Sequence, residues 1–197
     1  MRIFGVILAG GQGRRMGGAD KALLRLSGQT LIHRAMDRLE PQVERLAISA
    51  NGDPTRFDRF GLTVLGDDAS LGPLSGILSA LNWAATLGAT AVVSAPVDCP
   101  FLPPDLAPRL CLAAESSPSG TALAASGGVL HPTFGLWPTA LRAQLAQFLT
   151  SGAKARIKDF AAAHHAATAQ FPDDAAFANM NTPEDLARAS TLLGETG

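Results

Sequence analysis

The sequence contains little cysteine and no excess of charge of either sign. Its 197 residues include two Cys, 16 Lys or Arg and 17 Asp or Glu, which gives a formal net charge of −1. Cys99 and Cys111 form neither a disulfide framework nor the spacing of a metal site, as expected in a reducing cytoplasm. The near-neutral charge argues against an extended surface for nucleic acid.

Long apolar runs are also missing. The run from Ile3 to Ala9 is far too short to span a bilayer and lacks the features of a signal peptide. Hydrophobic residues still make up 47% of the chain and charged residues only 17%, which excludes disorder. A chain of this length buries about 70% of its unfolded surface on folding, so it needs no disulfide or structural metal. We expect a compact cytoplasmic protein with no membrane or nucleic-acid partner.

Short apolar runs alternate with helical patterns in the first half of the chain. Apolar runs predict strands at 3–8, 43–50, 62–65 and 90–95, and 3.6-residue periodicity predicts helices at 30–40 and 73–87. Strands separated by helices imply right-handed crossovers and a mostly parallel sheet. The sequence therefore predicts a Rossmann-like α/β fold with three layers, α/β/α, and ligands beyond the carboxyl ends of the strands.

The second half of the chain is less regular. Residues 121–125 and 129–137 read as strands around Gly127-Gly128, which predicts a hairpin added to the sheet. The remaining patterns predict helices at 105–115, 141–149, 153–165 and 182–193 and a strand at 166–171. Thr182 is the expected N-cap of the last helix, with Pro183 at its first position. Without a linker or a repeat, 1–197 is expected to be one domain.

The glycine-rich segment from Leu8 to Lys21 is the most informative part of the sequence. It follows the first strand and contains five Gly together with Arg14, Arg15 and Lys21. Glycines let the backbone amides turn toward an anion, and three cations suit a polyphosphate. The dinucleotide fingerprint fails at Met16, and the Walker pattern fails because the Lys comes too late. The alternative is a plain glycine-rich turn with solvated Arg side chains.

Several later segments agree with this loop in order and spacing. Together with residues 8–21 they most closely resemble the molybdenum cofactor guanylyltransferases, within the nucleotidyltransferase superfamily, over nearly the whole chain. The segments that carry the resemblance are Ser49-Ala50-Asn51, Asp67, Gly72-Pro73-Leu74-Ser75-Gly76, Pro96-Val97-Asp98-Cys99-Pro100, His131-Pro132 and Asn179 to Leu186. The resemblance implies a nucleotide-diphospho-sugar transferase type of fold, with 1–100 as the GTP-binding half and 101–197 as the acceptor-binding half.

The implied reaction transfers GMP from GTP to the terminal phosphate of molybdopterin, with or without bound molybdenum, and releases pyrophosphate. A phosphate monoester is largely a dianion near neutral pH, since its second pKa is about 6, so no catalytic triad is required. Positioning, cations and the cofactor Mg²⁺ carry such reactions. Molybdenum-insertion proteins or molybdoenzyme chaperones are expected as transient partners.

The resemblance also implies a role for individual residues. Catalytic roles fall to Arg15, Lys21 and Asp98, and Asp98 is also the expected metal ligand, because it follows the fourth strand at the ligand end of the sheet. The expected GTP-binding residues are Leu8, Ala9, Gly10, Gly11, Lys21, Ser49, Asn51, Asp67 and Asp98. The expected acceptor-binding residues are Arg14, His131, Asn179 and Asn181. For Asp98 the alternative is a turn residue, and for Asn181 it is capping of the last helix.

Other functions compete with this interpretation. A cytidylyltransferase with the same acceptor is the nearest, but such proteins tend to carry Ala-Ala-Gly at the position of Leu8 to Gly11 and usually lack the loop at 72–76. Sugar-1-phosphate nucleotidyltransferases usually run longer, and a dinucleotide-dependent oxidoreductase would need the missing fingerprint. A GTP-binding module without catalytic activity stays open.

Overall fold

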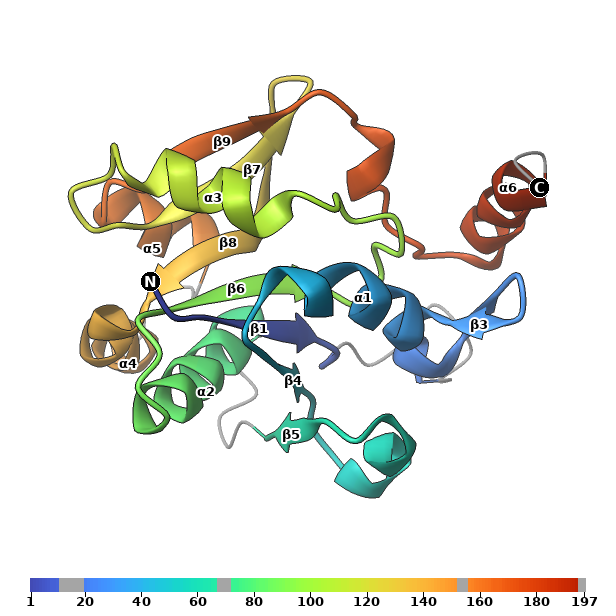
Figure 1. The fold of residues 1–197 in the computed structure, drawn as a ribbon, viewed down its shortest axis with the longest axis horizontal. Helices are drawn as coiled ribbons and strands as arrows, with labels where there is room; N and C mark the ends of the chain where they lie inside the picture. The colour runs from blue at the N-terminus through green and yellow to red at the C-terminus, as the bar shows by residue number, and fades with distance from the viewer. Residues whose placement is uncertain (11–19, 67–71, 152–155, 195–197) are drawn as a thin grey trace.

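The computed structural model describes residues 1–10, 20–66, 72–151 and 156–194 (Figure 1). A seven-stranded sheet lies at the centre of these residues, in the order β5-β4-β1-β6-β8-β7-β9. Its strands are β1 (Ile3–Leu8), β4 (Arg45–Ser49), β5 (Thr63–Leu65), β6 (Ala91–Pro96), β7 (Ala122–Ser126), β8 (Val129–Pro138) and β9 (Ala167–Phe171). Within this sheet only β8 runs against its neighbours, β6 and β7. The predicted mostly parallel sheet is confirmed.

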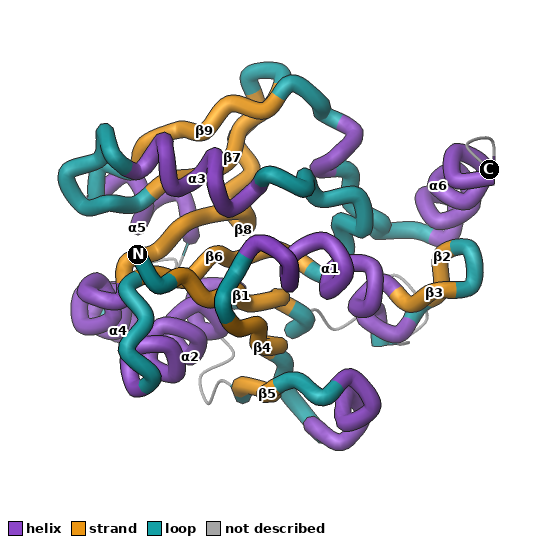
Figure 2. The backbone as a smooth tube through the Cα atoms, viewed as in Figure 1, coloured by secondary structure: helices purple, strands orange, loops and turns teal. Residues whose placement is uncertain are grey.

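Helices cover both faces of the sheet, so the described chain has three layers (Figure 2). One face packs against α1 (Leu31–Leu39) and α3 (Leu106–Ala114), and the other against α2 (Pro73–Thr86), α4 (Arg142–Thr150) and α5 (Ile157–Ala163). Neighbouring residues of one strand serve opposite faces: Ile7 lies in the first core and Val6 in the second. This explains why the central strands read as continuous apolar runs rather than as alternating patterns.

The predicted hairpin of β7 and β8 lies within the sheet rather than at its edge. β8 pairs with β6 on one side and β7 on the other, and β9 pairs in parallel with β7 at the edge of the sheet. In the first half of the chain, helices between the strands make neighbouring strands parallel. β7 and β8 are joined instead by a tight turn at Gly127 and Gly128, both at positive φ, so the chain reverses direction.

Other boundaries differ modestly from the prediction. The predicted strand at 43–50 is shorter because a 3₁₀ turn, η3 (Glu40–Gln42), precedes it. The predicted helix at 153–165 is described as α5 from Ile157, and residues 152–155 lie outside the described part. The last helix, α6 (Pro183–Gly194), begins as predicted and lies beside a small hairpin of β2 (Arg25–Leu26) and β3 (Gln29–Thr30) (Figure 1).

The β2–β3 hairpin was not predicted, because two-residue strands are too short for a periodic pattern. Its turn, Ser27-Gly28, has positive φ at both residues, which is the geometry of a type I′ turn. No helix in the described ranges combines the length and apolar character needed to cross a membrane.

Candidate active site

Four parallel strands end in register at one edge of the sheet. Leu8 of β1 pairs with Ser49 of β4 and with Pro96 of β6, and Ser49 pairs in turn with Leu65 of β5. The residues that follow these strands therefore emerge together, at the place where open α/β sheets bind ligands. The sequence predicted this meeting of Gly10, Asn51 and Asp98.

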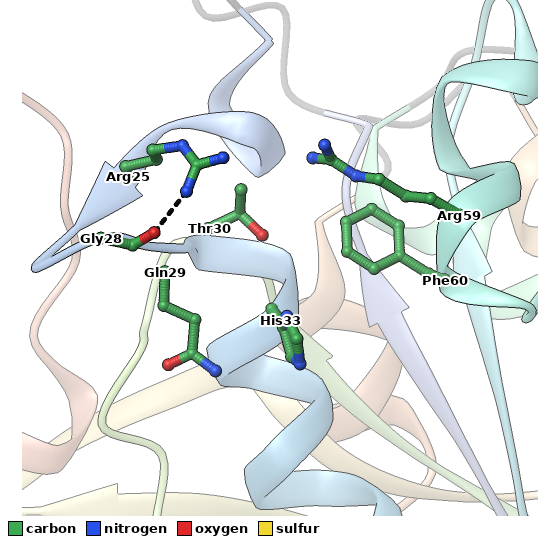
Figure 3. Close-up of a pocket in the computed structure, with 7 residues that line it drawn as sticks. All are labelled: Arg25, Gly28, Gln29, Thr30, His33, Arg59 and Phe60. Atoms are coloured by element: carbon green, nitrogen blue, oxygen red, sulfur yellow. Dashed lines mark hydrogen bonds between the residues drawn. The ribbon is translucent and has the colours of Figure 1, made fainter.

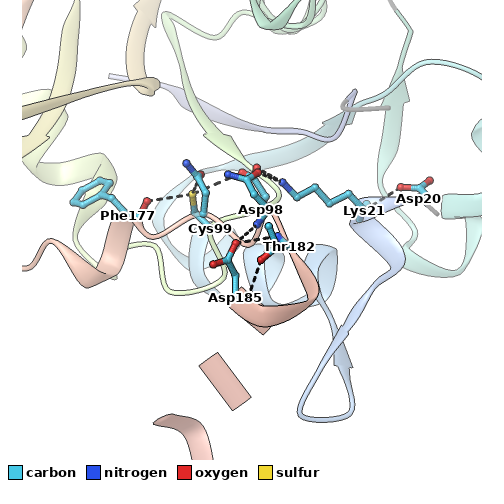
Figure 4. A network of polar contacts seen from close by, with 10 residues as sticks. Asp20, Lys21, Asp98, Cys99, Phe177, Thr182 and Asp185 are labelled. Carbon is cyan, nitrogen blue, oxygen red and sulfur yellow. Dashed lines mark hydrogen bonds and ion pairs between the residues drawn. The ribbon is translucent and has the colours of Figure 1, made fainter. Parts of the chain in front are cut away.

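The side chains of Lys21, Asp98 and Asn181 form the polar centre of this edge. Lys21 lies in a 3₁₀ turn, η2 (Lys21–Leu23), and its Nζ donates to Asp98 Oδ2 and to Asn181 Oδ1, both at 2.6 Å. The Lys21 and Asp98 side chains are only 13% and 21% exposed, and Figure 4 shows Lys21 extended toward Asp98. Residues far apart in the sequence thus place one cation and two oxygen ligands at one point.

The start of α6 determines where Asn181 points. Thr182 Oγ1 accepts from the Asp185 amide at 3.2 Å, while Asp185 Oδ2 accepts from the Thr182 and Asn181 amides at 2.9 and 3.0 Å. This reciprocal pair is a capping box with Asp in the Glu position, and a hydrogen bond from Arg188, with these amide bonds, lowers the pKa of Asp185. Capping therefore falls to Thr182 and Asp185, and the Asn181 side chain bonds Lys21 instead.

Cys99 ties the segment before α6 to the end of β6. The Met180 amide donates to the Asp98 carbonyl at 2.8 Å, and the buried Cys99 thiol donates to Asn179 Oδ1 at 2.8 Å. Burial raises the pKa of the Cys99 thiol far above its ordinary value, and the Asp98 carboxylate adds to the effect. Cys99 is therefore a neutral hydrogen-bond donor in this site, a role that the sequence did not reveal. Cys111, by contrast, is only partly buried.

The predicted nucleoside side is lined by Ala9, Gly10, Ser49 and Asn51. The Ala9 amide donates to the Ser49 carbonyl at 2.8 Å, so a nucleoside contact at Ala9 would have to come from its carbonyl group. Gly10 is exposed, has no positive φ, and a Cβ there would meet nothing within 4 Å in the part of the chain described. Neither backbone strain nor crowding by described residues explains the glycine.

Ser49 and Gly76 are in close contact beneath α2. Ser49 is buried, and a Cβ on Gly76 would overlap its Oγ. The first turn of α2 can approach the strand ends because position 76 lacks a side chain. Gly72 precedes the helix at φ 87° and Pro73 takes the first helical position, as predicted.

His131 lies on β8, and its side chain is half-buried. Its ring stacks on Phe177 at 4.2 Å between centroids, with 2° between the planes, and its Nε2 lies 2.8 Å from Ser126 Oγ. Burial lowers the pKa of His131, and the Asp174 carboxylate partly opposes this. The Phe177 carbonyl oxygen lies 3.6 Å from Cys99 Sγ, so Phe177 connects the His131 ring to the segment of Asp98. Figure 4 shows Phe177 beside Cys99. Its predicted contact with the acceptor stays a prediction.

Four of the predicted site residues lie outside the described part of the chain: Gly11, Arg14, Arg15 and Asp67. Among the described residues, Arg56 contacts two site segments and was not singled out from the sequence. The sequence feature that could have drawn attention to Arg56 is Asp53-Pro54, which predicts a capped turn just before it.

A pocket lies between the β2–β3 hairpin and a 3₁₀ segment, η4 (Pro54–Phe60). It has a volume of about 440 Å³ and contains none of the predicted site residues. Arg25 and Arg59 face each other across its opening (Figure 3). The lining residues are Arg25, Gly28, Gln29, Thr30, His33, Arg59 and Phe60.

Comparison with known proteins gives consistent relatives. A family model described as "MobA-like NTP transferase domain" matches residues 5–168. A protein of Cereibacter sphaeroides named molybdenum cofactor guanylyltransferase is 59% identical over 193 residues, which is 98% of each chain.

Solved structures agree on the fold. Molybdopterin-guanine dinucleotide biosynthesis protein A from Archaeoglobus fulgidus is 20% identical and superposes with a TM-score of 0.73, covering 98% of this chain and 99% of that one. The 2-C-methyl-D-erythritol 4-phosphate cytidylyltransferase of Thermus thermophilus is 21% identical with a TM-score of 0.70, covering 98% of each. At these identities the likeness concerns the fold alone, and it confirms the predicted nucleotidyltransferase architecture.

Proposed function

The chain belongs to the MobA-like NTP transferase family, and on that premise we propose that it transfers GMP from GTP to the terminal phosphate of molybdopterin. The products are the guanine dinucleotide form of the cofactor and pyrophosphate. The observation that carries the proposal is the convergence of Lys21, Asp98 and Asn181 at the ligand end of the sheet. The 59% identical relative that is named molybdenum cofactor guanylyltransferase supports guanine as the transferred base.

The proposed reaction needs positioning more than acid–base catalysis. An oxygen of the acceptor phosphate forms a bond to the α-phosphorus of GTP. The bond from that phosphorus to the α–β bridging oxygen breaks, and the electron pair leaves with pyrophosphate. The acceptor phosphate is already mostly a dianion at neutral pH, since its second pKa is about 6. The main barrier is therefore the repulsion between two anions, which cations at the reacting phosphates reduce.

Lys21 is suited to the phosphate side of this reaction. Its ammonium is largely withdrawn from solvent, where an electrostatic interaction with phosphate is stronger than in water. Its Nζ is hydrogen-bonded to Asp98, which follows β6, and to Asn181, in the segment before α6. Lys21 would bind the phosphates that leave, and Arg15 is proposed to do the same.

Asp98 and Asn181 fit a magnesium ion. They offer a carboxylate group and an amide oxygen, which are hard ligands, and a bound ion would replace the Lys21 ammonium at the oxygens it now contacts. No group of three or more His, Cys, Asp or Glu side chains suited to a metal occurs among the described residues. Mg²⁺ commonly uses one or two protein ligands together with substrate phosphates. When bound, the ion would neutralise phosphate charge as pyrophosphate leaves.

The nucleoside is proposed to bind beside Gly10, Ser49 and Asn51. Exposed space at Gly10 and the close approach of α2 to Ser49 support a flat ligand at this edge. Leu8, Ala9, Gly11 and Asp67 complete the proposed GTP contacts. Arg14, His131, Asn179 and Asn181 are proposed for the acceptor.

One experiment tests the reaction directly. Purified protein is offered molybdopterin, with and without molybdate, together with each of the four NTPs and Mg²⁺, and pyrophosphate release is measured. The proposal expects release with GTP and loss of release when the ion is removed with EDTA. Release with CTP but not GTP would make the chain a cytidylyltransferase. Tight GTP binding without turnover would favour a binding module.

The setting of the reaction follows from the same proposal. We place the protein in the cytoplasm, where its unpaired Cys residues would stay reduced. The product would have to pass to a protein that inserts it, so contact with molybdenum-insertion proteins or molybdoenzyme chaperones is part of the proposal.

A further inference from the structure

Arg56 joins two segments of the site that are otherwise separate. It lies in η4, and its guanidinium donates to Asp20 Oδ2 at 2.6 Å, to the Asn51 carbonyl at 2.7 Å and to the Asp53 carbonyl at 2.5 Å. The guanidinium carbon also lies 4.6 Å from the centre of the Phe57 ring. Every nitrogen of this guanidinium therefore has an acceptor, and one face of the group is covered.

The segment that carries Arg56 is itself fixed. Asp53 caps η4, with its Oδ1 accepting from the Thr55 amide at 2.9 Å and from Thr55 Oγ1 at 2.8 Å. Gly61 ends the segment in the left-handed conformation, and Phe57 is fully buried. Because both ends and the centre are anchored, the Arg56 side chain starts from a defined position next to the end of β4.

Asp20 connects Arg56 to Lys21. The Asp20 side chain caps η2, with Oδ1 accepting from the Ala22 amide at 3.0 Å, while its other oxygen binds Arg56. The pair is shielded from solvent, with 24% exposure of each side chain. The Asp20 carboxylate thus caps the turn that contains Lys21, and it also binds the Arg56 guanidinium, which contacts the Asn51 carbonyl as well.

We propose that Arg56 is a positioning residue that fixes Lys21 relative to Asn51. In the proposed function, on which this inference rests, these two residues contact the phosphate and nucleoside ends of one nucleotide. Arg56 then sets the spacing between the two subsites without touching substrate. Arginine suits this task because its planar fork satisfies several acceptors at fixed angles, whereas a lysine offers one flexible ammonium.

Arg59 provides a matched control for Arg56. It lies three residues further along η4, and its guanidinium also covers a phenylalanine ring, with 4.8 Å to the centre of Phe60. No ion pair links it to an acidic side chain in the described ranges. Arg59→Ala also removes one positive charge and one contact with a phenylalanine ring, but it leaves the partners of Arg56, Asp20 and Asn51, unchanged.

The test compares Arg56→Ala, Arg56→Lys and Arg59→Ala in steady-state kinetics with GTP and molybdopterin. Misplacement of a reacting group by about 1 Å costs about 100-fold, so Arg56→Ala is expected to lower kcat/KM for GTP by about that factor. Arg56→Lys is expected to recover less than half of this loss on a logarithmic scale. Arg59→Ala is expected to stay within about twofold of wild type.

A double-mutant cycle separates positioning from a general loss of stability. If Arg56 acts through Asp20, the variant with both Arg56→Ala and Asp20→Asn should be no more than about threefold worse than Arg56→Ala alone, because residues that act as a unit are not additive. Asn at position 20 keeps an oxygen for the Ala22 amide that Asp20 caps. Independent, multiplying losses would overturn the proposal. The melting temperature of each variant, and assays kept well below it, exclude unfolding as the cause.

Hydrogen exchange in the ligand-free protein gives a readout that does not depend on turnover. Residues 20–24 should exchange faster in Arg56→Ala than in Arg59→Ala, with global unfolding unchanged. A wild-type enzyme that is inactive with every NTP would overturn the proposed function, while this exchange pattern would still test the link. Equal kinetics and equal exchange in Arg56→Ala and Arg59→Ala would overturn the inference about Arg56.

Discussion

The two halves of the chain contribute to the site in different ways. The first half supplies parallel strands that end in register, so that Gly10, Asn51 and Asp98 emerge side by side from local rules. The second half places Asn179 and Asn181 between β9 and α6, on a segment that hydrogen bonds attach to Asp98 and Cys99. Topology thus positions the first set, whereas specific tertiary contacts position the second.

The positions of these two sets of residues should therefore differ in how sensitive they are to substitutions elsewhere in the chain. Residues at strand ends are held by the whole sheet and are insensitive to single surface changes. Asn181 depends on a capping box and a few hydrogen bonds, so its position should respond to mild substitutions. The following substitutions test that contrast, beginning with the largest expected effect.

Replacing Asp98 with alanine should remove most activity while leaving the fold intact. Loss of one group that stabilises the transition state costs about 3–4 kcal/mol, or about 10²–10³ in rate. The measurement is kcat with saturating GTP and Mg²⁺, together with a thermal melt. Asp105→Ala is the control, because Asp105 pairs with Arg109 on the surface. Wild-type turnover by folded Asp98→Ala would remove Asp98 from the reaction.

Replacing Asn181 with alanine should have a smaller effect on the same reaction. It removes one hydrogen bond to a charged group, worth about 1.5–3 kcal/mol, so kcat/KM should fall by about 10- to 100-fold. Lys21 keeps its bond to Asp98, which is why the loss should not exceed that of Asp98→Ala. A larger loss for Asn181→Ala than for Asp98→Ala would show that activity depends more on the second half of the chain than on the strand ends of the first half.

Adding a side chain at Gly10 should affect nucleotide binding and leave stability unchanged. A valine there meets no described atom near its Cβ, yet it would fill the space proposed for the nucleoside. We expect KM for GTP to rise about tenfold, the equivalent of about 1.4 kcal/mol, with the melting temperature within a few degrees of wild type. A fall in stability with unchanged KM would assign Gly10 to the fold instead.

Removing the cap of α6 should have the mildest effect. Thr182→Ala loses an N-cap, which costs about 1 kcal/mol of unfolding free energy, and kcat/KM should drop severalfold because Asn181 is less firmly placed. Thr191→Ala, at an exposed position in the last turn of the same helix, is the control. The free energy of unfolding in urea and kcat/KM are measured for both variants. Equal activities would show that the capping box does not position Asn181.

The sequence predicted the fold and the convergence of the first strands' ends well, for physical reasons. The strand at 3–8 matches β1 at both ends, since a buried strand bounded by glycine leaves little ambiguity. The position of Asp98 at the ligand end of the sheet follows from its place after the fourth strand, whereas its role is implied by the resemblance. The β2–β3 hairpin and the position of β8 inside the sheet were missed, because short strands and pairing order depend on tertiary contacts.

The roles of Cys99 and Arg56 could not be predicted for the same reason. A lone thiol in the sequence reads as an apolar residue, and only the fold brings Asn179 within 2.8 Å of it. Arg56 reads as one of several charges after a turn, and its bond to Asp20 spans 36 residues. For Asn181, the sequence left capping of the last helix and contact with the metal or the acceptor open. Thr182 and Asp185 do the capping and the Asn181 side chain bonds Lys21, while its contact with the metal or the acceptor stays a prediction.

The most direct measurement of the central claim follows the α-phosphate of the nucleotide. Wild-type protein is given molybdopterin, Mg²⁺ and GTP labelled at the α-phosphorus, and the products are separated by chromatography. The account predicts that the label appears in a guanine dinucleotide containing the pterin, in equal amount to the pyrophosphate released. Label that stays in GTP, or that appears in free GMP with no dinucleotide, would contradict it.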